Sequence, residues 1–218
     1  MTDALGNPSG RATGRRRAGH ESPAQRRERH AAETDPEVVL AAAVRFLEAR
    51  PRSVAEVRRR LRGSGYPPPL IETAVGRLEE LGFLDDETFA RSWVESRDRA
   101  RPRGERALRS ELLGKGIDRA VIDLVLAERR GDGEPGPDGD GPPVDADEAA
   151  ARRLIARHAR SLGRVTDPRA RRQRAYALLA RNGFDPDVAG RVARDLDLSS
   201  EVRDDDGDGV EDRSSEVV

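Results

Sequence analysis

The sequence lacks cysteine and contains few aromatic residues. Without cysteine, neither a disulfide nor a thiolate metal site can form. The one Trp, two Tyr and four Phe all lie between positions 46 and 184. Large apolar side chains are needed to offset the entropy that a chain loses on folding, so both ends are predicted to be disordered. No apolar run approaches the roughly 20 residues of a membrane span, and no apolar secretory signal opens the chain, so we expect a cytoplasmic protein.

The net charge of −1 conceals a strong segregation of charge along the chain. Residues 36–130 carry +3 and residues 148–197 carry +6, whereas residues 131–147 and 198–218 each carry −6. The first 35 residues carry +2. The segments predicted to fold are therefore basic, which suits an anionic partner despite the near-neutral total.

One spacing pattern occurs three times: a leucine four residues before a glycine that is followed by a large apolar residue. The three sites are Leu61-Gly65-Tyr66, Leu112-Gly116-Ile117 and Leu179-Gly183-Phe184. The glycines are 51 and 67 residues apart, and the difference of 16 is close to the length of the Gly-, Pro- and Asp-rich segment 131–147. Removing that segment restores a single period, which indicates stacked supersecondary units.

Each unit is predicted to contain three helices. Apolar residues recur at helical spacing, and helix starts are marked by Asp35-Pro36 and by the capping box Ser53 to Glu56. No apolar–polar alternation suggests a strand, so the predicted class is all-α. The expected organisation is a disordered basic arm (1–35), repeat 1 (36–84), repeat 2 (85–130), an acidic linker (131–147), repeat 3 (148–197) and a disordered acidic tail (198–218).

Three such repeats side by side would make an elongated, curved body rather than a sphere. Repeats 1 and 2 share a short junction and are expected to pack together. The acidic linker leaves the placement of repeat 3 open. The acidic tail could fold over the basic face of repeat 3 and compete with polyanions.

The sequence offers no catalytic constellation. The phosphate-binding pattern G-x-x-x-x-G-K-[ST] is absent. Of the three histidines, His20 and His30 fall in the predicted arm, and His158 lies on an apolar stripe, as a core histidine would. The segment 204–209 begins like a calcium-binding EF-hand loop, but position 12 is Ser215 rather than the Glu that such a loop requires. We expect no enzyme activity, no metal and no cofactor.

Arginine clusters are the candidate functional groups. Guanidinium groups bind phosphates and carboxylates through paired hydrogen bonds, although a solvated, salt-bridged surface would explain any one cluster. In residues 148–197, however, twelve Arg face only six acidic residues. The candidate partner-binding residues are Arg52, Arg58, Arg59 and Arg62 in repeat 1, Arg97, Arg101, Arg103, Arg106 and Arg109 in repeat 2, and Arg153, Arg157, Arg160 and Arg164, spaced as a stripe along the first helix of repeat 3.

Three stretches resemble the RecX family of recombinase regulators. They are Arg50 to Val57 (RPRSVAEV), Leu81 to Ala90 (LGFLDDETFA) and Leu112 to Ile122 (LLGKGIDRAVI). The resemblance is clear over 40–130, includes Gly104, and is weak over 148–197. It implies a non-enzymatic cytoplasmic protein that binds the RecA recombinase, chiefly as its filament on DNA. Such a protein would damp ATP hydrolysis, strand exchange and filament growth in homologous recombination, DNA repair and the SOS response to DNA damage.

Two other functions compete with this one. A three-helix unit with an Arg-rich second or third helix could be a helix-turn-helix DNA-binding domain. Against that, the helices offer almost no Asn or Gln for reading bases beyond Gln173 and Asn182. A general helical-repeat scaffold is the other alternative. We expect a monomer without membrane contact, and at most weak, sequence-independent DNA binding.

Overall fold

The described residues form ten α-helices and no strand, which confirms the all-α prediction. The computed structural model describes residues 21–131 and 145–204, with side chains in the last helix as far as Leu196. The helices are α1 (Pro23–Ala31), α2 (Pro36–Leu47), α3 (Val54–Ser64), α4 (Pro68–Glu80), α5 (Asp86–Ala100), α6 (Glu105–Gly114), α7 (Arg119–Gly131), α8 (Ala146–Leu162), α9 (Pro168–Arg181) and α10 (Pro186–Asp204).

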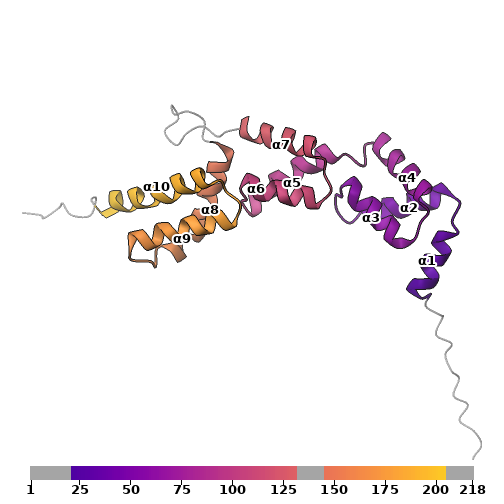
Figure 1. The fold of residues 1–218 in the computed structure, drawn as a ribbon, viewed down its shortest axis with the longest axis horizontal. Coiled ribbons are helices and arrows are strands. Elements are labelled where there is room, and N and C mark those ends of the chain that lie inside the picture. The colour runs from indigo at the N-terminus through magenta and orange to yellow at the C-terminus, as the bar shows by residue number, and fades with distance from the viewer. Residues whose placement is uncertain (1–20, 132–144, 205–218) are drawn as a thin grey trace, which may run out of the picture.

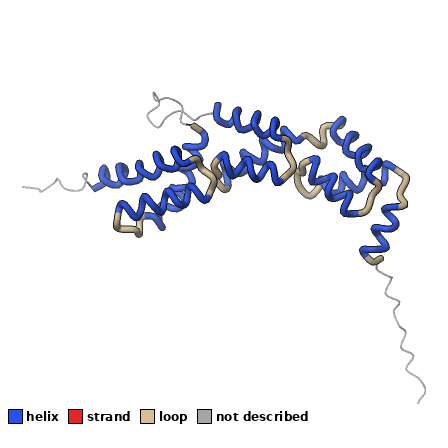
Figure 2. Tube along the Cα trace, in the orientation of Figure 1, coloured by secondary structure: helices blue, strands red, loops and turns tan. Residues whose placement is uncertain are grey.

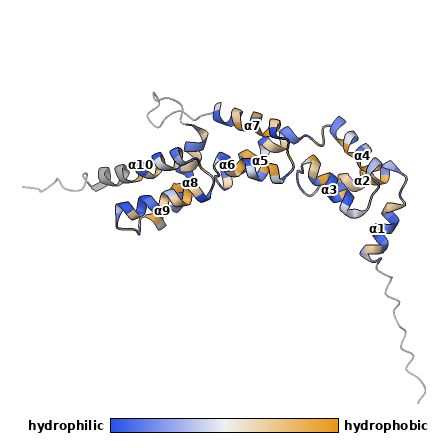
Figure 3. Cartoon of the chain, in the orientation of Figure 1, coloured by the Kyte–Doolittle hydropathy of each residue, from blue (hydrophilic) through white to orange (hydrophobic). Residues whose placement is uncertain are grey.

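The helices group into three repeats, α2–α4, α5–α7 and α8–α10, which follow one another along an elongated, curved body (Figures 1 and 2). Each repeat encloses its own buried apolar cluster. Apolar and polar residues are interspersed around the helices, as in amphipathic helices that bury one side (Figure 3). Leu61, Leu112 and Leu179 occupy corresponding positions in the three clusters and are at most 2% exposed. The threefold internal repetition predicted from spacing is therefore present.

The recurring Leu-Gly-apolar pattern marks the end of the second helix of each repeat. The glycines have φ angles of 96°, 80° and 80°, a left-handed conformation that residues with a Cβ rarely adopt. The residue after each glycine donates its N–H to the leucine carbonyl five positions earlier, which is a Schellman motif. These N–O distances are 3.3 Å for Tyr66 to Leu61, 3.1 Å for Ile117 to Leu112 and 3.3 Å for Phe184 to Leu179.

A fourth copy of the local pattern lies outside the repeat register, at the end of α4. The N–H of Phe83 donates to the carbonyl of Leu78 at 2.9 Å, and Gly82 has a φ of 72°. Phe83 is 67% exposed here, and the next residue, Leu84, is buried instead. The pattern therefore specifies a helix end, but only the surrounding repeat decides which side chain enters the core.

The helix α1 lies within the arm that composition predicted to be disordered. Ser22 and Gln25 form a capping box at its start. Its one buried side chain, His30, stacks on Tyr66 with ring centroids 4.2 Å apart, and Nδ1 lies 2.8 Å from the carbonyl oxygen of Ser64. A count of large apolar residues overlooked this helix because a histidine supplies the docking contact. Residues 1–20 lie outside the described part of the chain.

Helices extend into both segments that were predicted to be acidic and unstructured. The helix α7 extends through Gly131, and Asp145 is the N-cap of α8, with its carboxylate accepting from the N–H of Asp147. The helix α10 continues to Asp204, into the predicted tail. The predictions made for residues 132–144 and 205–218, including a tail that covers repeat 3, concern residues outside the described part.

Candidate partner-binding surface and the contacts that hold it

Repeats 1 and 2 meet where the start of α3 contacts the start of α5 and the turn after α6. The N–H of Val54 donates to Oδ1 of Asp86 at 2.9 Å, so a carboxylate of repeat 2 satisfies a free N–H at the start of α3. Ser53 donates its hydroxyl to the carbonyl of Lys115 at 2.7 Å. The Nζ of Lys115 lies 2.8 Å from Oε1 of Glu56. These bonds fix repeat 1 against repeat 2.

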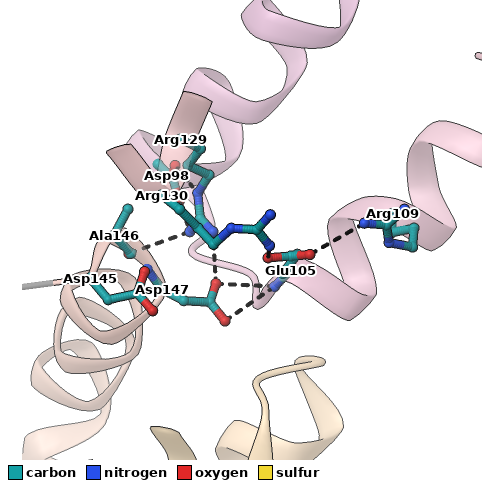
Figure 4. A network of polar contacts seen from close by, with 8 residues as sticks. All are labelled: Asp98, Glu105, Arg109, Arg129, Arg130, Asp145, Ala146 and Asp147. Atoms are coloured by element: carbon teal, nitrogen blue, oxygen red, sulfur yellow. Dashed lines mark hydrogen bonds and ion pairs between the residues drawn. The ribbon is translucent and has the colours of Figure 1, made fainter. Parts of the chain in front are cut away.

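Repeats 2 and 3 repeat this arrangement and add a buried cation (Figure 4). The N–H of Glu105, at the start of α6, donates to Oδ1 of Asp147 at 3.0 Å, just as Val54 donates to Asp86. Arg129, only 7% exposed, donates through Nε and Nη2 to the two carboxylate oxygens of Asp98 at 2.9 and 3.0 Å. Its Nη1 donates to Oδ1 of Asp147 at 2.7 Å. One guanidinium thus joins α5, α7 and α8.

Further bonds across this second junction fix repeat 3 in place. Arg103 donates to Oδ1 of Asn182 at 2.8 Å, and the N–H of Gly104 donates to the Asn182 carbonyl at 3.0 Å. Arg157 donates to backbone carbonyls at the end of α5, including that of Arg99 at 2.7 Å. Repeat 3 is therefore docked against repeat 2, whereas the sequence left its placement open.

Burial is the largest influence on the pKa of the carboxyl that each junction shares, Asp86 or Asp147. It raises the pKa of the Asp86 and Asp147 carboxyls, and at Asp147 the bonds from Arg129 offset this effect only in part. Burial alone would lower the pKa of Arg129, but its bonds to Asp98 and Asp147 outweigh that effect and raise it. The guanidinium is therefore charged. Because desolvating such groups is costly, the network adds little net stability, but removing one partner would leave a buried charge unpaired.

Seven of the thirteen candidate arginines are engaged within the molecule. Three of these cross the second junction or line it: Arg103 and Arg157 as above, and Arg153, which makes an interaction of its own and lines a hollow between α5, α7 and α8. The others are Arg52 over the Phe46 ring at 4.2 Å, Arg58 with Glu72 at 2.8 Å, Arg97 with Glu111 at 2.7 Å, and Arg109 with Asp123.

The other six candidates are exposed and have no ion pair with any described residue. They are Arg59 and Arg62 on α3, Arg101 and Arg106 on either side of the start of α6, and Arg160 and Arg164 at the end of α8. The predicted stripe along α8 is interrupted, because Arg157 turns toward repeat 2 and Arg164 lies past the helix end at Leu162. Each repeat therefore presents two of the candidate arginines to a partner.

Sequence reasoning missed the residues that hold the repeats together. Arg129 and Asp98 lie on helices that were predicted only by their apolar stripes, and Asp147 was counted as one of six acids in the linker. The spacing between these residues contains no recognisable signal, since their proximity follows from how α7 packs on α8.

The described helices and side chains provide neither a membrane span nor a metal site. None of those helices is long and apolar enough to cross a membrane. No three potential metal ligands of the described part lie close enough together to hold an ion.

Comparison with known proteins identifies the family. Models described as the first, second and third three-helix domains of RecX match residues 40–78, 85–126 and 145–192. The chain is 34% identical over 161 residues to the regulatory protein RecX of Streptomyces coelicolor, covering 73% of this chain and 78% of that one. Against the regulatory protein RecX of Mycobacterium avium it is 33% identical over 156 residues, covering 72% and 83%.

A solved structure shows the same fold. The crystal structure of RecX from Lactobacillus salivarius aligns with a TM-score of 0.61 at 20% sequence identity, covering 75% of this chain and 97% of that one. The third family domain begins at residue 145, which agrees with the N-cap of α8. With three matching domains in order along the stack, the chain belongs to the RecX family of regulatory proteins.

Proposed function

We propose that this protein binds the RecA recombinase, chiefly as its filament on DNA, and inhibits its ATPase, strand exchange and filament growth. It would thereby modulate homologous recombination and DNA repair. Membership of a family of regulatory proteins supports a regulatory role without catalysis. The regulator works by binding alone, so its surface groups carry the function.

The observation that carries the proposal is the distribution of unpaired arginines. Two candidate arginines that have no ion pair with any described residue lie on each repeat, and the two junctions hold the three repeats in one arrangement along a curved body. Several weak contacts on one rigid frame act as a single linked association. A frame that touches neighbouring recombinase subunits at once would restrain the movements that their ATPase cycle requires.

The test is recombinase ATPase on single-stranded DNA, measured with increasing amounts of this protein. A variant with Arg59, Arg62, Arg160 and Arg164 changed to alanine removes the available candidate arginines of the two outer repeats. An exposed charge pair typically contributes about 0.2–1 kcal/mol, so four losses amount to about 0.8 kcal/mol or more. We expect the inhibitory concentration to rise at least about fourfold.

A matched control changes four other exposed arginines that have no ion pair with any described residue: Arg119, Arg174, Arg181 and Arg194. This control should inhibit like the wild type. If it loses as much inhibition as the first variant, the candidate arginines do not carry the binding. If the wild type leaves ATPase and filament length unchanged at stoichiometric amounts, the proposed function is wrong. Tight, sequence-specific binding to bare DNA would instead favour a helix-turn-helix DNA-binding protein.

A further inference from the structure

A cleft between α1, α2 and α3 collects arginines without acidic residues. It has a volume of about 650 Å³. Its basic lining comprises Arg26 and Arg27 from α1, Arg45 from α2, Arg60 from α3, and His30, while the Phe46 ring contributes an apolar wall. None of its lining residues is Asp or Glu. None of the thirteen candidate arginines lines this cleft. The sequence predicted that α1 belongs to the disordered arm and that α2 and α3 belong to repeat 1, so the cleft lies between two segments that were expected to be separate.

The helix α1 builds the cleft by taking the position of a missing repeat at the start of the stack (Figure 1). At both junctions, the glycine turn of one repeat lies against the second helix of the repeat before it. A Cβ added to Gly183 would come within 2.5 Å of Ala107, and a Cβ added to Gly116 would come similarly close to Ala55. The corresponding turn of repeat 1 lies against α1, where a Cβ on Gly65 would come 2.8 Å from the carbonyl oxygen of Arg27.

Electrostatics separate this contact from the two true junctions. Each junction brings in a carboxylate, Asp86 or Asp147, that accepts from the preceding repeat. Among the described residues, α1 brings no carboxylate into the cleft and places Arg26 and Arg27 there instead. Arg27 and Arg45 are exposed and have no ion pair with any described residue. Arginines that converge on a concave surface without counter-charges focus a positive potential there.

The other two arginines of the cleft, Arg60 and Arg26, make only weak contacts with neighbouring side chains. The guanidinium of Arg60 lies 5.7 Å from the centroid of the Phe46 ring and has no carboxylate partner among the described residues. Arg26 lies 3.6 Å from Glu21, which is outside the cleft lining, and the Arg26 side chain is 56% exposed. All four side chains can therefore turn toward an anion in the cleft.

We propose that this cleft binds linked phosphate groups, from a nucleic-acid strand or a free polyphosphate. A single carboxylate engages one or two guanidinium groups, whereas successive phosphates offer charge to arginines on three helices. The volume also lies within the range of about 300–1,000 Å³ that ligand pockets occupy. This site goes beyond the proposed regulation of recombinase, because it uses none of the candidate arginines and requires no recombinase to be occupied.

The experiment measures binding of the full chain to a fluorescein-labelled oligothymidylate of ten nucleotides by fluorescence anisotropy at several salt concentrations. The variant R45E/R60E removes two cleft arginines that do not hold α1 in place. We expect at least about a tenfold loss of affinity, and a slope of log K against log salt that is smaller by about 1.4, since each single-strand phosphate contact contributes about 0.7.

The matched control R119E/R194E makes the same charge change on α7 and α10, outside the cleft. The conservative variant R45K/R60K keeps both charges and should retain most of the affinity and all of the salt slope. Circular dichroism establishes that every variant is folded. If R45E/R60E binds no more weakly than the control, the cleft is not the site and the proposal fails.

Competition with inorganic tripolyphosphate separates the two sources of phosphate. Displacement of the oligonucleotide by tripolyphosphate at micromolar concentrations assigns the site to free polyphosphates, and a lack of displacement assigns it to a strand; both support the proposal when the binding depends on Arg45 and Arg60. Polyglutamate of equal charge that displaces the oligonucleotide as well as tripolyphosphate does would overturn it. Because no recombinase is present, these results do not depend on the outcome of the ATPase test.

Discussion

The two junctions between repeats share one backbone arrangement but differ in the side chains that hold it. In both, a carboxylate at the start of one repeat accepts the first N–H of the second helix of the repeat before it. At the junction of repeats 1 and 2, Lys115 and Glu56 add a partly buried ion pair. At the junction of repeats 2 and 3, Arg129 is buried between two carboxylates.

The covalent connection explains why the second junction carries more bonds. Only the residues 81–85 separate α4 from α5, so the chain itself keeps repeats 1 and 2 together. The segment 132–145 separates α7 from α8. A longer connection costs more entropy when its ends are brought together and allows more wrong placements. A buried ion network penalises every placement that leaves one of its charges unpaired.

Changing Arg129 to methionine should produce the largest difference in stability between the two junctions. The substitution leaves Asp147 buried and Asp98 partly buried without their cation, which typically costs about 3–5 kcal/mol. We expect repeat 3 to unfold or detach at lower urea concentration than repeats 1 and 2. Hydrogen exchange of α8–α10, followed alongside urea unfolding, measures this directly.

The corresponding substitution at the first junction changes Lys115 to methionine. Glu56 keeps the N–H of Ser53 and a contact with Arg50 at 3.7 Å, so the expected loss is only about 1 kcal/mol. Arg91 to methionine serves as a control, because its ion pairs with glutamates on α5 and α7 are exposed. Equal losses for the three variants would show that the buried network does not distinguish the junctions.

The next largest effect is expected from Gly183 to alanine. The substitution has two costs: a left-handed conformation at φ 80°, roughly 1–2 kcal/mol, and a Cβ placed 2.5 Å from Ala107 across the junction. Gly82 to alanine carries only the first cost, because no atom lies within 4 Å of its Cβ position. The difference between the two variants, about 1–3 kcal/mol, measures the packing of the junction in urea unfolding. Identical losses would mean that repeat 3 shifts to accommodate the methyl group.

Local signals made most of the fold predictable. Asp35, Ser53 and Asp85 accept from N–H groups within their own first helical turn, so the bond that starts each helix lies within a few adjacent residues. The Schellman motifs are equally local, and their period revealed the repeats. The helix α1 carried such a signal in its capping box, but the contact that docks it joins His30 to Tyr66, 36 residues later.

The candidate surface was predictable only in part, for the same reason. Arg58 and Arg59 are adjacent and chemically identical, yet Arg58 pairs with Glu72 on α4 while Arg59 stays exposed. Which of them is available depends on how α3 packs against α4. Sequence identifies where arginines concentrate, but the choice between an internal partner and an external one is made by tertiary packing.

The smallest expected effect comes from Asp86 to asparagine, which tests the carboxylate that the junctions share. Burial raises the pKa of Asp86 above its usual value of 3.8, and neighbouring Asp85 adds to this, while the N–H of Val54 opposes it. The folded state therefore holds the proton more tightly, and the buried charge costs stability as pH rises above 3.8 and through the raised pKa. Asparagine still presents an Oδ1 to Val54 but carries no charge.

The variant should therefore match or exceed the wild type at pH 7, by about 0.5 kcal/mol, and the difference should vanish below pH 3.8, where Asp86 is neutral in both states. Urea midpoints at pH 7 and pH 3 check both values. A variant that is less stable than the wild type only at pH 7 would show that the negative charge itself strengthens the junction. The negative charge of Asp86 would then stabilise the positive end of α3. At the second junction, the Arg129 network would add to the same kind of charge interaction between Asp147 and the start of α6.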